Sequence, residues 1–307
     1  MTTAGGSSPR TFSHAFLVGA ALSLQLVASF AYPIAKYGLA QIEPFTYAFY
    51  RFMLSSVVLL ILVKLKKHDT RIERKDWPRF VLLGILIIPF NQTLFLVGQH
   101  LTGAGHGAFL FSTTPVLIFV LALIHLNEKF NRRRAIGSAI AFSGVMIIML
   151  SGVLDVSIEY LIGDLIILAS VLAWGYYTIV GKSLVLKYGA LRTTAYALAI
   201  GSAIYFPFGL YRAITFDYTN VTLGAWGSVA FMALGLSVFV YVLWYWLLKQ
   251  MEVSRVAIYH NVQPVIATVV AWLALGEPIT LPFIVGGLTV LVGVITSETT
   301  PRQIVRG

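Results

Sequence analysis

Residues 113–147 read TTPVLIFVLALIHLNEKFNRRRAIGSAIAFSGVMI, and residues 262–296 read VQPVIATVVAWLALGEPITLPFIVGGLTVLVGVIT. The two stretches align without a gap at an offset of 149, with nine identities in 35 positions. Four of these identities fall on residues that shape helices or their ends, namely Pro115/Pro264, Glu128/Glu277, Gly137/Gly286 and Gly144/Gly293. A duplicated half made almost wholly of apolar residues is typical of a transporter built around an internal symmetry axis.

The composition of the chain indicates a membrane protein. Of its 307 residues, 58% are hydrophobic and only 11% are charged, and the mean hydropathy is +0.84. A soluble domain carries about a quarter charged residues, so lipid must be the solvent for most of this chain. The net charge of +10 would suggest nucleic acid as the partner of a soluble protein. Here the charges cluster in short links between apolar stretches, where orientation in a bilayer explains them, so we expect lipid and no nucleic acid.

Ten stretches are long and apolar enough to cross a bilayer as helices. They predict an all-α integral membrane protein with one five-helix repeat over residues 1–151 and a second over residues 160–297. A cleaved signal peptide is the competing interpretation of the first stretch, but its apolar run exceeds the usual length of roughly 7–15 residues. The expected spans are approximately 14–36, 44–63, 80–99, 104–126, 134–151, 160–182, 191–211, 223–248, 254–275 and 280–297.

The basic residues predict the orientation of these spans. If the N-terminus is cytoplasmic, 19 of the 22 Lys and Arg residues lie in cytoplasmic segments, as the positive-inside rule expects. Both termini are then cytoplasmic. Because each half has an odd number of spans, the second half is inverted relative to the first. Accordingly, the corner at 129–134 carries four basic residues, whereas its counterpart at 278–283 carries none.

Several motifs of the chain resemble one family of transporters. The stretch 233–295 holds Pro264 and Glu277 before a glycine-bearing last helix, and the stretch 82–130 is a weaker copy of it. In EPFTYAFYRF (residues 43–52), a proline stands seven residues before Arg51. Together with Trp174, Gly175, Lys182 and Lys36, these motifs resemble the EamA-type half-unit of the drug/metabolite transporter superfamily over about residues 14–297. The chain departs from that pattern at Ser29, Phe30 and Ala31, and at Ala197, where a counterpart of Arg51 would stand.

Within that superfamily the chain most resembles bacterial exporters of amino acids, including the aromatic amino-acid exporters. The resemblance implies a secondary transporter of the bacterial inner membrane, in which a central cavity between the repeats exports amino acids (aromatic and other neutral) or related small metabolites by alternating access. Export of drugs or other metabolites, or a channel, stays open as an alternative. The resemblance implies no cofactor and leaves the oligomeric state open. An enzyme is disfavoured because the chain has no cysteine, no H-E-x-x-H motif and no mid-span pair of aspartates.

Inverted repeats place the transport site near the bilayer midplane, where a polar side chain must face a cavity or another helix. Asn91, Gln92 and Phe95 share one side of the third span, and their eighth-span counterparts are Val240, Tyr241 and Trp244. Amides on one wall and aromatic rings on the other suit an amphiphilic solute. The expected substrate-binding residues are Tyr32, Asn91, Gln92, Phe95, His106, Phe109, Ser112, Trp174, Tyr177, Tyr241, Trp244, Tyr259, His260 and Gln263.

Structural roles compete with these assignments. The aromatic residues also suit interface anchors, the amides suit contacts between helices, and both histidines suit a structural role. Lys36 and Lys182, near span ends, either gate the cavity or snorkel to the interface. Arg51 lies deeper, and we expect it to pair with a backbone carbonyl or a nearby acid. Small residues predict close helix contacts at Gly137, Ala141, Gly144, Gly286, Val290 and Gly293.

The position of the carboxylates bears on the energetics of transport. Every Asp and Glu falls at or near a span end or in a link, so none stands in the middle of a span. Proton-driven transporters usually need a titratable group within the membrane. The sequence therefore favours facilitated export, with proton exchange through a histidine as the alternative, and it predicts no metal site.

Overall fold

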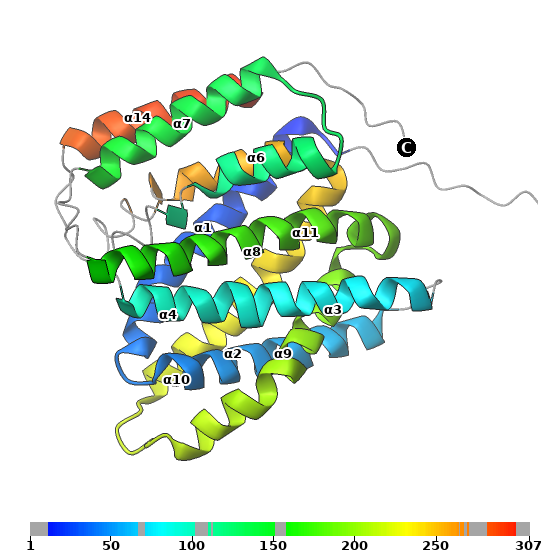
Figure 1. Cartoon of the computed structure of the whole chain (residues 1–307), viewed down its shortest axis with the longest axis vertical. Helices are drawn as coiled ribbons and strands as arrows, with labels where there is room; N and C mark the ends of the chain where they lie inside the picture. The colour runs from blue at the N-terminus through cyan, green and yellow to red at the C-terminus, as the bar shows by residue number, and fades with distance from the viewer. Residues whose placement is uncertain are drawn as a thin grey trace, which may run out of the picture.

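The computed structural model describes residues 12–66, 71–101, 110–111, 113–150, 158–263, 265–266, 269 and 281–298. Every regular element in these ranges is a helix, and the helices pack as a bundle (Figure 1). The elements are α1 (His14–Leu39), α2 (Pro44–Leu65), η1 (Arg74–Asp76), α3 (Trp77–Ile85), η2 (Leu86–Gln92), α4 (Thr93–Leu101), α6 (Thr114–His125), α7 (Arg132–Leu150), α8 (Ile158–Tyr188), α9 (Ala190–Thr215), α10 (Leu223–Phe231), η3 (Met232–Val240), α11 (Tyr241–Gln250), α12 (Val253–Ala257), η4 (Ile258–Asn261) and α14 (Leu281–Glu298).

Six helical segments in the described ranges are long and apolar enough to cross a membrane. Two shorter apolar helices, Thr114–His125 and Ile284–Ser297, fall within two further expected spans. The expected spans 104–126 and 254–275 run through residues outside the described ranges, so the count of ten and the cytoplasmic termini stay predictions. The six long segments are His14–Ala31, Pro44–Leu65, Arg74–Phe95, Leu161–Tyr188, Ala190–Thr215 and Leu223–Gln250.

The outer face of the bundle is apolar. Leu165, Ile214 and Ile295 are 62%, 71% and 62% exposed, and many other large aliphatic side chains share that surface. Exposed apolar surface costs about 25 cal/mol per Å² in water, but it carries no such cost against lipid tails. Long apolar helices with this surface define a multi-pass membrane protein.

Two widened helical turns lie at corresponding places in the two halves. The third expected span is helical throughout as α3, η2 and α4, and the eighth as α10, η3 and α11, with π-helical turns in η2 and η3. Pro89 lies inside η2, where it lacks an N–H to donate and crowds the preceding turn. At an offset of 149, η2 falls on residues 235–241 and so overlaps η3. π-Helical turns are rare and are frequent at functional sites.

The last helices of the two halves pack directly on each other. In Figure 1, α7 (green) and α14 (orange to red) lie side by side at one edge of the bundle. A Cβ added at Gly144 would lie 2.5 Å from the carbonyl oxygen of Gly286, and one at Gly137 would lie 2.6 Å from that of Gly293. The backbones therefore touch where the small residues predicted close contact. The order of these contacts makes α7 and α14 antiparallel.

A second pair of corresponding helices meets elsewhere in the bundle. The hydroxyl of Ser56 on α2 lies 2.8 Å from that of Ser202 on α9. These serines are counterparts at the offset of 146 that also relates Lys36 to Lys182. A residue touches its own counterpart only close to a symmetry axis. Corresponding helices of the two halves thus contact each other in two places, at α2/α9 and at α7/α14.

We predict that Gly144→Ala lowers the thermal unfolding midpoint of the purified protein in detergent. The added methyl group would meet backbone on α14, which cannot move aside as a side chain can, and overpacking of this kind costs about 1–3 kcal/mol. Gly19→Ala is the matched control, because nothing lies within 4 Å of a Cβ at Gly19. Equal midpoints for the two variants would show that the contact between α7 and α14 is not tight.

Candidate functional site

Arg51 lies at the centre of the candidate site. This side chain of α2 is only 6% exposed. Its Nε donates to Ser237 Oγ at 3.0 Å, and its Nη1 donates to Gln92 Oε1 at 3.3 Å. Ser237 belongs to η3 and Gln92 to η2, so one guanidinium links the widened turns of both halves. The prediction that Arg51 pairs with a backbone carbonyl or an acid was wrong. A hydroxyl oxygen and an amide oxygen accept its hydrogen bonds instead.

The two neighbouring amides of η2 have different partners. Asn91 is 1% exposed and donates from Nδ2 to the Ser170 carbonyl of α8 at 2.9 Å. Ser170 returns a bond from Oγ to the Asn91 carbonyl at 2.9 Å. Gln92 donates to Asn91 Oδ1 at 2.6 Å and accepts from Arg51. Asn91 thus joins two helices, while Gln92 extends a hydrogen-bonded chain from α8 to Arg51.

Aromatic residues of three elements gather beside this polar chain. The ring of Trp174 on α8 lies 5.5 Å from Tyr177, 5.6 Å from Tyr241 and 5.8 Å from Trp244, centroid to centroid. Trp244 in turn lies 4.8 Å from His260 on η4. Five expected site residues, from α8, α11 and η4, therefore form one continuous cluster. Offset and tilted rings at these distances attract each other beyond their simple burial.

Tyr241 connects the aromatic cluster to the polar chain. It is 5% exposed, its ring packs on Trp174, and its hydroxyl interacts with the Arg51 guanidinium. Gln92 and Tyr241 are counterparts at the offset of 149, and both meet Arg51. A charged group and a broad aromatic surface thus lie side by side in the interior of the bundle.

Several polar atoms of this region lack a partner. Among the described residues, nothing forms a hydrogen bond with Arg51 Nη2, Trp244 Nε1 or His260 Nε2, although each atom is buried. The side chain of His260 also interacts with that of Gln263. Unsatisfied buried donors are rare in folded proteins and call for an explanation, and a bound solute would provide one.

Gln263 touches the cluster through His260, and the remaining expected site residues lie apart from it or outside the described residues. Phe95 packs edge-on against Phe111 at 5.1 Å, and the carbonyl of Gln263 accepts from Ser29 at 3.1 Å. Tyr259, 1% exposed, borders a lateral apolar pocket between α1, η4 and α14. His106, Phe109 and Ser112 lie outside the described residues, as do the side chains of Tyr32 and Lys36, whose backbones belong to α1.

Lys182, the other expected gating residue, is bonded to the end of a neighbouring helix. Its Nζ donates to the carbonyl of Met251 at 2.7 Å and to that of Leu248. These are orphan carbonyls at the end of α11, where a cation also meets the negative end of the helix dipole. Lys182 also interacts with the carboxylates of Glu128 and Glu252.

Glu128, one of the repeated glutamates, joins the halves near Lys182. It accepts from the backbone N–H of Val253 at 2.7 Å and from Ser254, and so caps the N-terminus of α12 from the other half of the chain. Arg134 forms an ion pair with Glu252 beside it. A carboxylate at a helix N-terminus also meets the positive end of the helix dipole.

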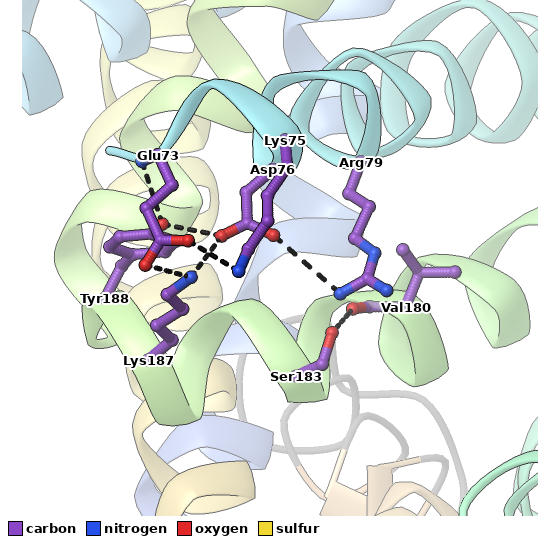
Figure 2. Close-up of polar contacts among 8 residues, drawn as sticks. All are labelled: Glu73, Lys75, Asp76, Arg79, Val180, Ser183, Lys187 and Tyr188. Carbon is purple, nitrogen blue, oxygen red and sulfur yellow. Dashed lines mark hydrogen bonds and ion pairs between the residues drawn. The ribbon is translucent and has the colours of Figure 1, made fainter.

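A cluster of charges joins the halves at one end of the bundle (Figure 2). Lys187 at the end of α8 lies 2.6 Å from Asp76 and 2.6 Å from Glu73, at the start of the third span. Tyr188 donates to Asp76 at 2.6 Å and accepts from the Glu73 N–H at 3.0 Å. Hydrogen bonds from Lys187 and then Lys75 hold the pKa of the Glu73 carboxyl below its ordinary value.

Different contacts join the halves near the start of α2. Arg212 of α9 forms an ion pair with Glu43. Tyr47 lies 3.2 Å from Ser228, oxygen to oxygen, and Gln41 accepts from the N–H of Thr222 at 3.0 Å. The polar and aromatic centre thus lies between two sets of contacts that hold the halves together.

A multi-pass helical bundle whose two similar halves enclose a polar and aromatic centre is the architecture of a membrane transporter. The chain belongs to the EamA-like transporter family, which matches it twice, over residues 15–150 and 161–298. The resemblance of its motifs to that family is therefore confirmed.

Relatives along nearly the whole chain carry the names of transporters. The uncharacterized transporter YyaM of Bacillus subtilis (strain 168) is 29% identical over 280 residues, which cover 90% of this chain and 92% of the relative. An uncharacterized transporter of Archaeoglobus fulgidus is 28% identical, with 87% and 92% covered. A probable terminal-alkyne amino-acid exporter of Streptantibioticus cattleyicolor is 27% identical, with 73% and 74% covered. The fold is similar to that of a protein of known crystal structure, with a TM-score of 0.79 and 15% sequence identity. The match covers 94% of this chain and 99% of the other, and it shows the fold alone.

We predict that Lys187→Met lowers the thermal unfolding midpoint by several degrees at neutral pH, because Asp76, only 4% exposed, loses its nearest cation. Lys64→Met is the control, since Lys64 pairs with no carboxylate in the part of the chain that the structure describes. A depressed carboxyl pKa stabilises the fold above the unfolded-state pKa, about 4.3 for Glu, and that stability is lost as the pH falls through the folded-state pKa. The difference from wild type should therefore shrink in acid; a constant difference from neutral to acidic pH would contradict the ion-pair account.

Proposed function

We propose that this protein exports amino acids, aromatic and other neutral, or related small metabolites across a bacterial inner membrane. One observation carries the proposal: Arg51, which donates to the amide of Gln92, interacts with Tyr241, and the ring of Tyr241 continues into the buried rings of Trp174 and Trp244. A neutral amino acid has the same two parts, a charged head and an apolar or aromatic side chain. Sites for such ligands combine an apolar wall with a few fixed polar groups.

The relationship to a probable terminal-alkyne amino-acid exporter supports this substrate class. The residues available in the centre support it as well. The cluster offers aromatic faces rather than several cations, so it suits a solute with little net charge. A carrier for multiply charged phosphorylated solutes would need more basic residues deep in the spans.

We further infer that transport proceeds by alternating access in a ten-span protein with inverted halves and cytoplasmic termini. The antiparallel packing of α7 on α14 and the contact between Ser56 and Ser202 support inverted halves. In this mechanism the halves rock about their shared axis. The contacts of Lys187 at one end and of Arg212 at the other would open in turn.

Flux through the purified protein in liposomes tests the substrate class. Liposomes loaded with labelled phenylalanine, threonine or methionine should lose at least one of these solutes faster than protein-free liposomes. Absence of flux for all three would refute the proposal.

Trp244→Ala should slow the export of labelled phenylalanine about tenfold, which corresponds to roughly 1.4 kcal/mol, because the ring packs against both Trp174 and His260 in the aromatic cluster. Trp246→Ala is a matched control on the same helix: its ring packs instead on Phe12 and Phe16 at 5.1 and 6.0 Å. It should export at the wild-type rate. Equal rates for the two variants, with similar amounts inserted, would remove Trp244 from the substrate path.

A further inference from the structure

We propose that Arg51 binds the carboxylate of the transported solute, so that the substrate class is narrowed to carboxylate-bearing amphiphiles. This inference rests on the proposed function. Arg51 is not among the substrate-binding residues that the sequence predicts.

The hydrogen bonds of Arg51 are incomplete. A guanidinium has five N–H donors in a planar fork. Two donor atoms, Nε and Nη1, have partners in Ser237 and Gln92, while Nη2 has none among the described residues. The side chain is 94% buried, as its exposed fraction of 6% implies, so water does not readily satisfy that donor. Nη2 therefore keeps N–H groups that can donate to an oxygen atom of a bound solute.

The charge of Arg51 is also uncompensated. No carboxylate in the described part of the chain forms an ion pair with it, and Glu43, which caps the N-terminus of α2, pairs with Arg212 instead. The ring of Phe52, 4.7 Å from the guanidinium carbon, offers only a cation–π contact. A buried cation without a counter-ion is strongly unfavourable, so an anion that enters the bundle would be attracted to this place.

The surroundings of Arg51 select the kind of anion. One guanidinium matches one carboxylate in charge and binds it with two parallel hydrogen bonds. A phosphate dianion would leave a net negative charge in the interior. Next to the guanidinium, Tyr241 begins an aromatic surface that continues through Trp174 and Trp244. The carboxylate therefore faces Arg51, while the apolar part of the solute faces the rings.

Carboxylate binding to Arg51 would also weaken a contact between the two halves of the chain. The bonds from Arg51 to Gln92 and Ser237 connect η2 to η3, and therefore one half of the chain to the other. A carboxylate that takes two N–H groups of the fork competes with one of these bonds. Binding would thus loosen a contact between the halves at the point where they must move for alternating access.

The test compares solutes that differ only in the carboxylate. Liposomes containing wild-type protein should export labelled phenylalanine at least tenfold faster than labelled phenylalaninol, in which an alcohol replaces the acid. Arg51→Gln should reduce this ratio to within about twofold of one, and Arg51→Lys should keep a clear preference for the acid. Lys64→Gln removes a cation of the same helix that pairs with no carboxylate in the described part of the chain, and it should leave the ratio at its wild-type value.

The outcomes separate this inference from the proposed function. Wild-type export of phenylalanine together with a ratio near one would overturn the role of Arg51 and leave the proposed function standing. An Arg51→Gln protein that keeps the wild-type ratio would do the same. No flux of phenylalanine, threonine or methionine through the wild-type protein would overturn both. Should Arg51→Gln fail to insert, the wild-type ratio and the Arg51→Lys variant decide the matter.

Discussion

The structure depends on direct backbone contact between α7 and α14. Lipid tails are as apolar as leucine, so hydrophobic burial does not press transmembrane helices together, and close packing must hold them instead. Gly137 and Gly144 on one helix face Gly293 and Gly286 on the other, with no room for a side chain at either crossing. Because the same glycines recur in both halves, one repeated sequence element builds both surfaces of the contact. Duplication of one half therefore produced both glycine-bearing surfaces of the contact between α7 and α14.

Within this frame, the widened turns of η2 and η3 bring the polar residues to the centre. Pro89 explains the first turn, since a proline disrupts a regular helix. The second turn contains no proline; there Ser237 bonds back to the carbonyl of Met232, five residues earlier, at 3.2 Å. Both turns contact the side chain of Arg51, directly through Ser237 and through Gln92 at the end of η2. The π-helical turns of the two halves are thus connected by the buried guanidinium of Arg51. The polar centre therefore lies where the two halves meet.

Much of this arrangement follows from the sequence, and the part that does not has a physical reason. Residue type and the offset of 149 predict that Tyr241 and Trp244 lie opposite Gln92 and Phe95. In the structure Tyr241 packs on Trp174, and Trp244 packs on His260. The partners of Arg51 stand 41 and 186 positions away, and the rotation of each helix about its axis decides such contacts. Lys182 is a second example. The sequence shows that it lies near a span end, but its hydrogen bonds to the end of α11 can be known only from how the helices pack.

The two halves share a fold, but the residues at corresponding positions in the centre differ. Gln92 and Tyr241 occupy equivalent positions and both meet the guanidinium of Arg51, one with an amide and the other with a phenol. Phe95 and Trp244 are also counterparts, yet Phe95 packs on Phe111 while Trp244 joins the central cluster. Arg51 itself has only Ala197 as its counterpart. A strictly symmetric centre would offer the same groups to both ends of a solute, whereas the amino acids proposed as substrates have two unlike ends. Divergence at these few positions gives the first half Arg51 and Gln92 and the second half the rings of Tyr241 and Trp244, while the backbone contacts between α7 and α14 stay intact.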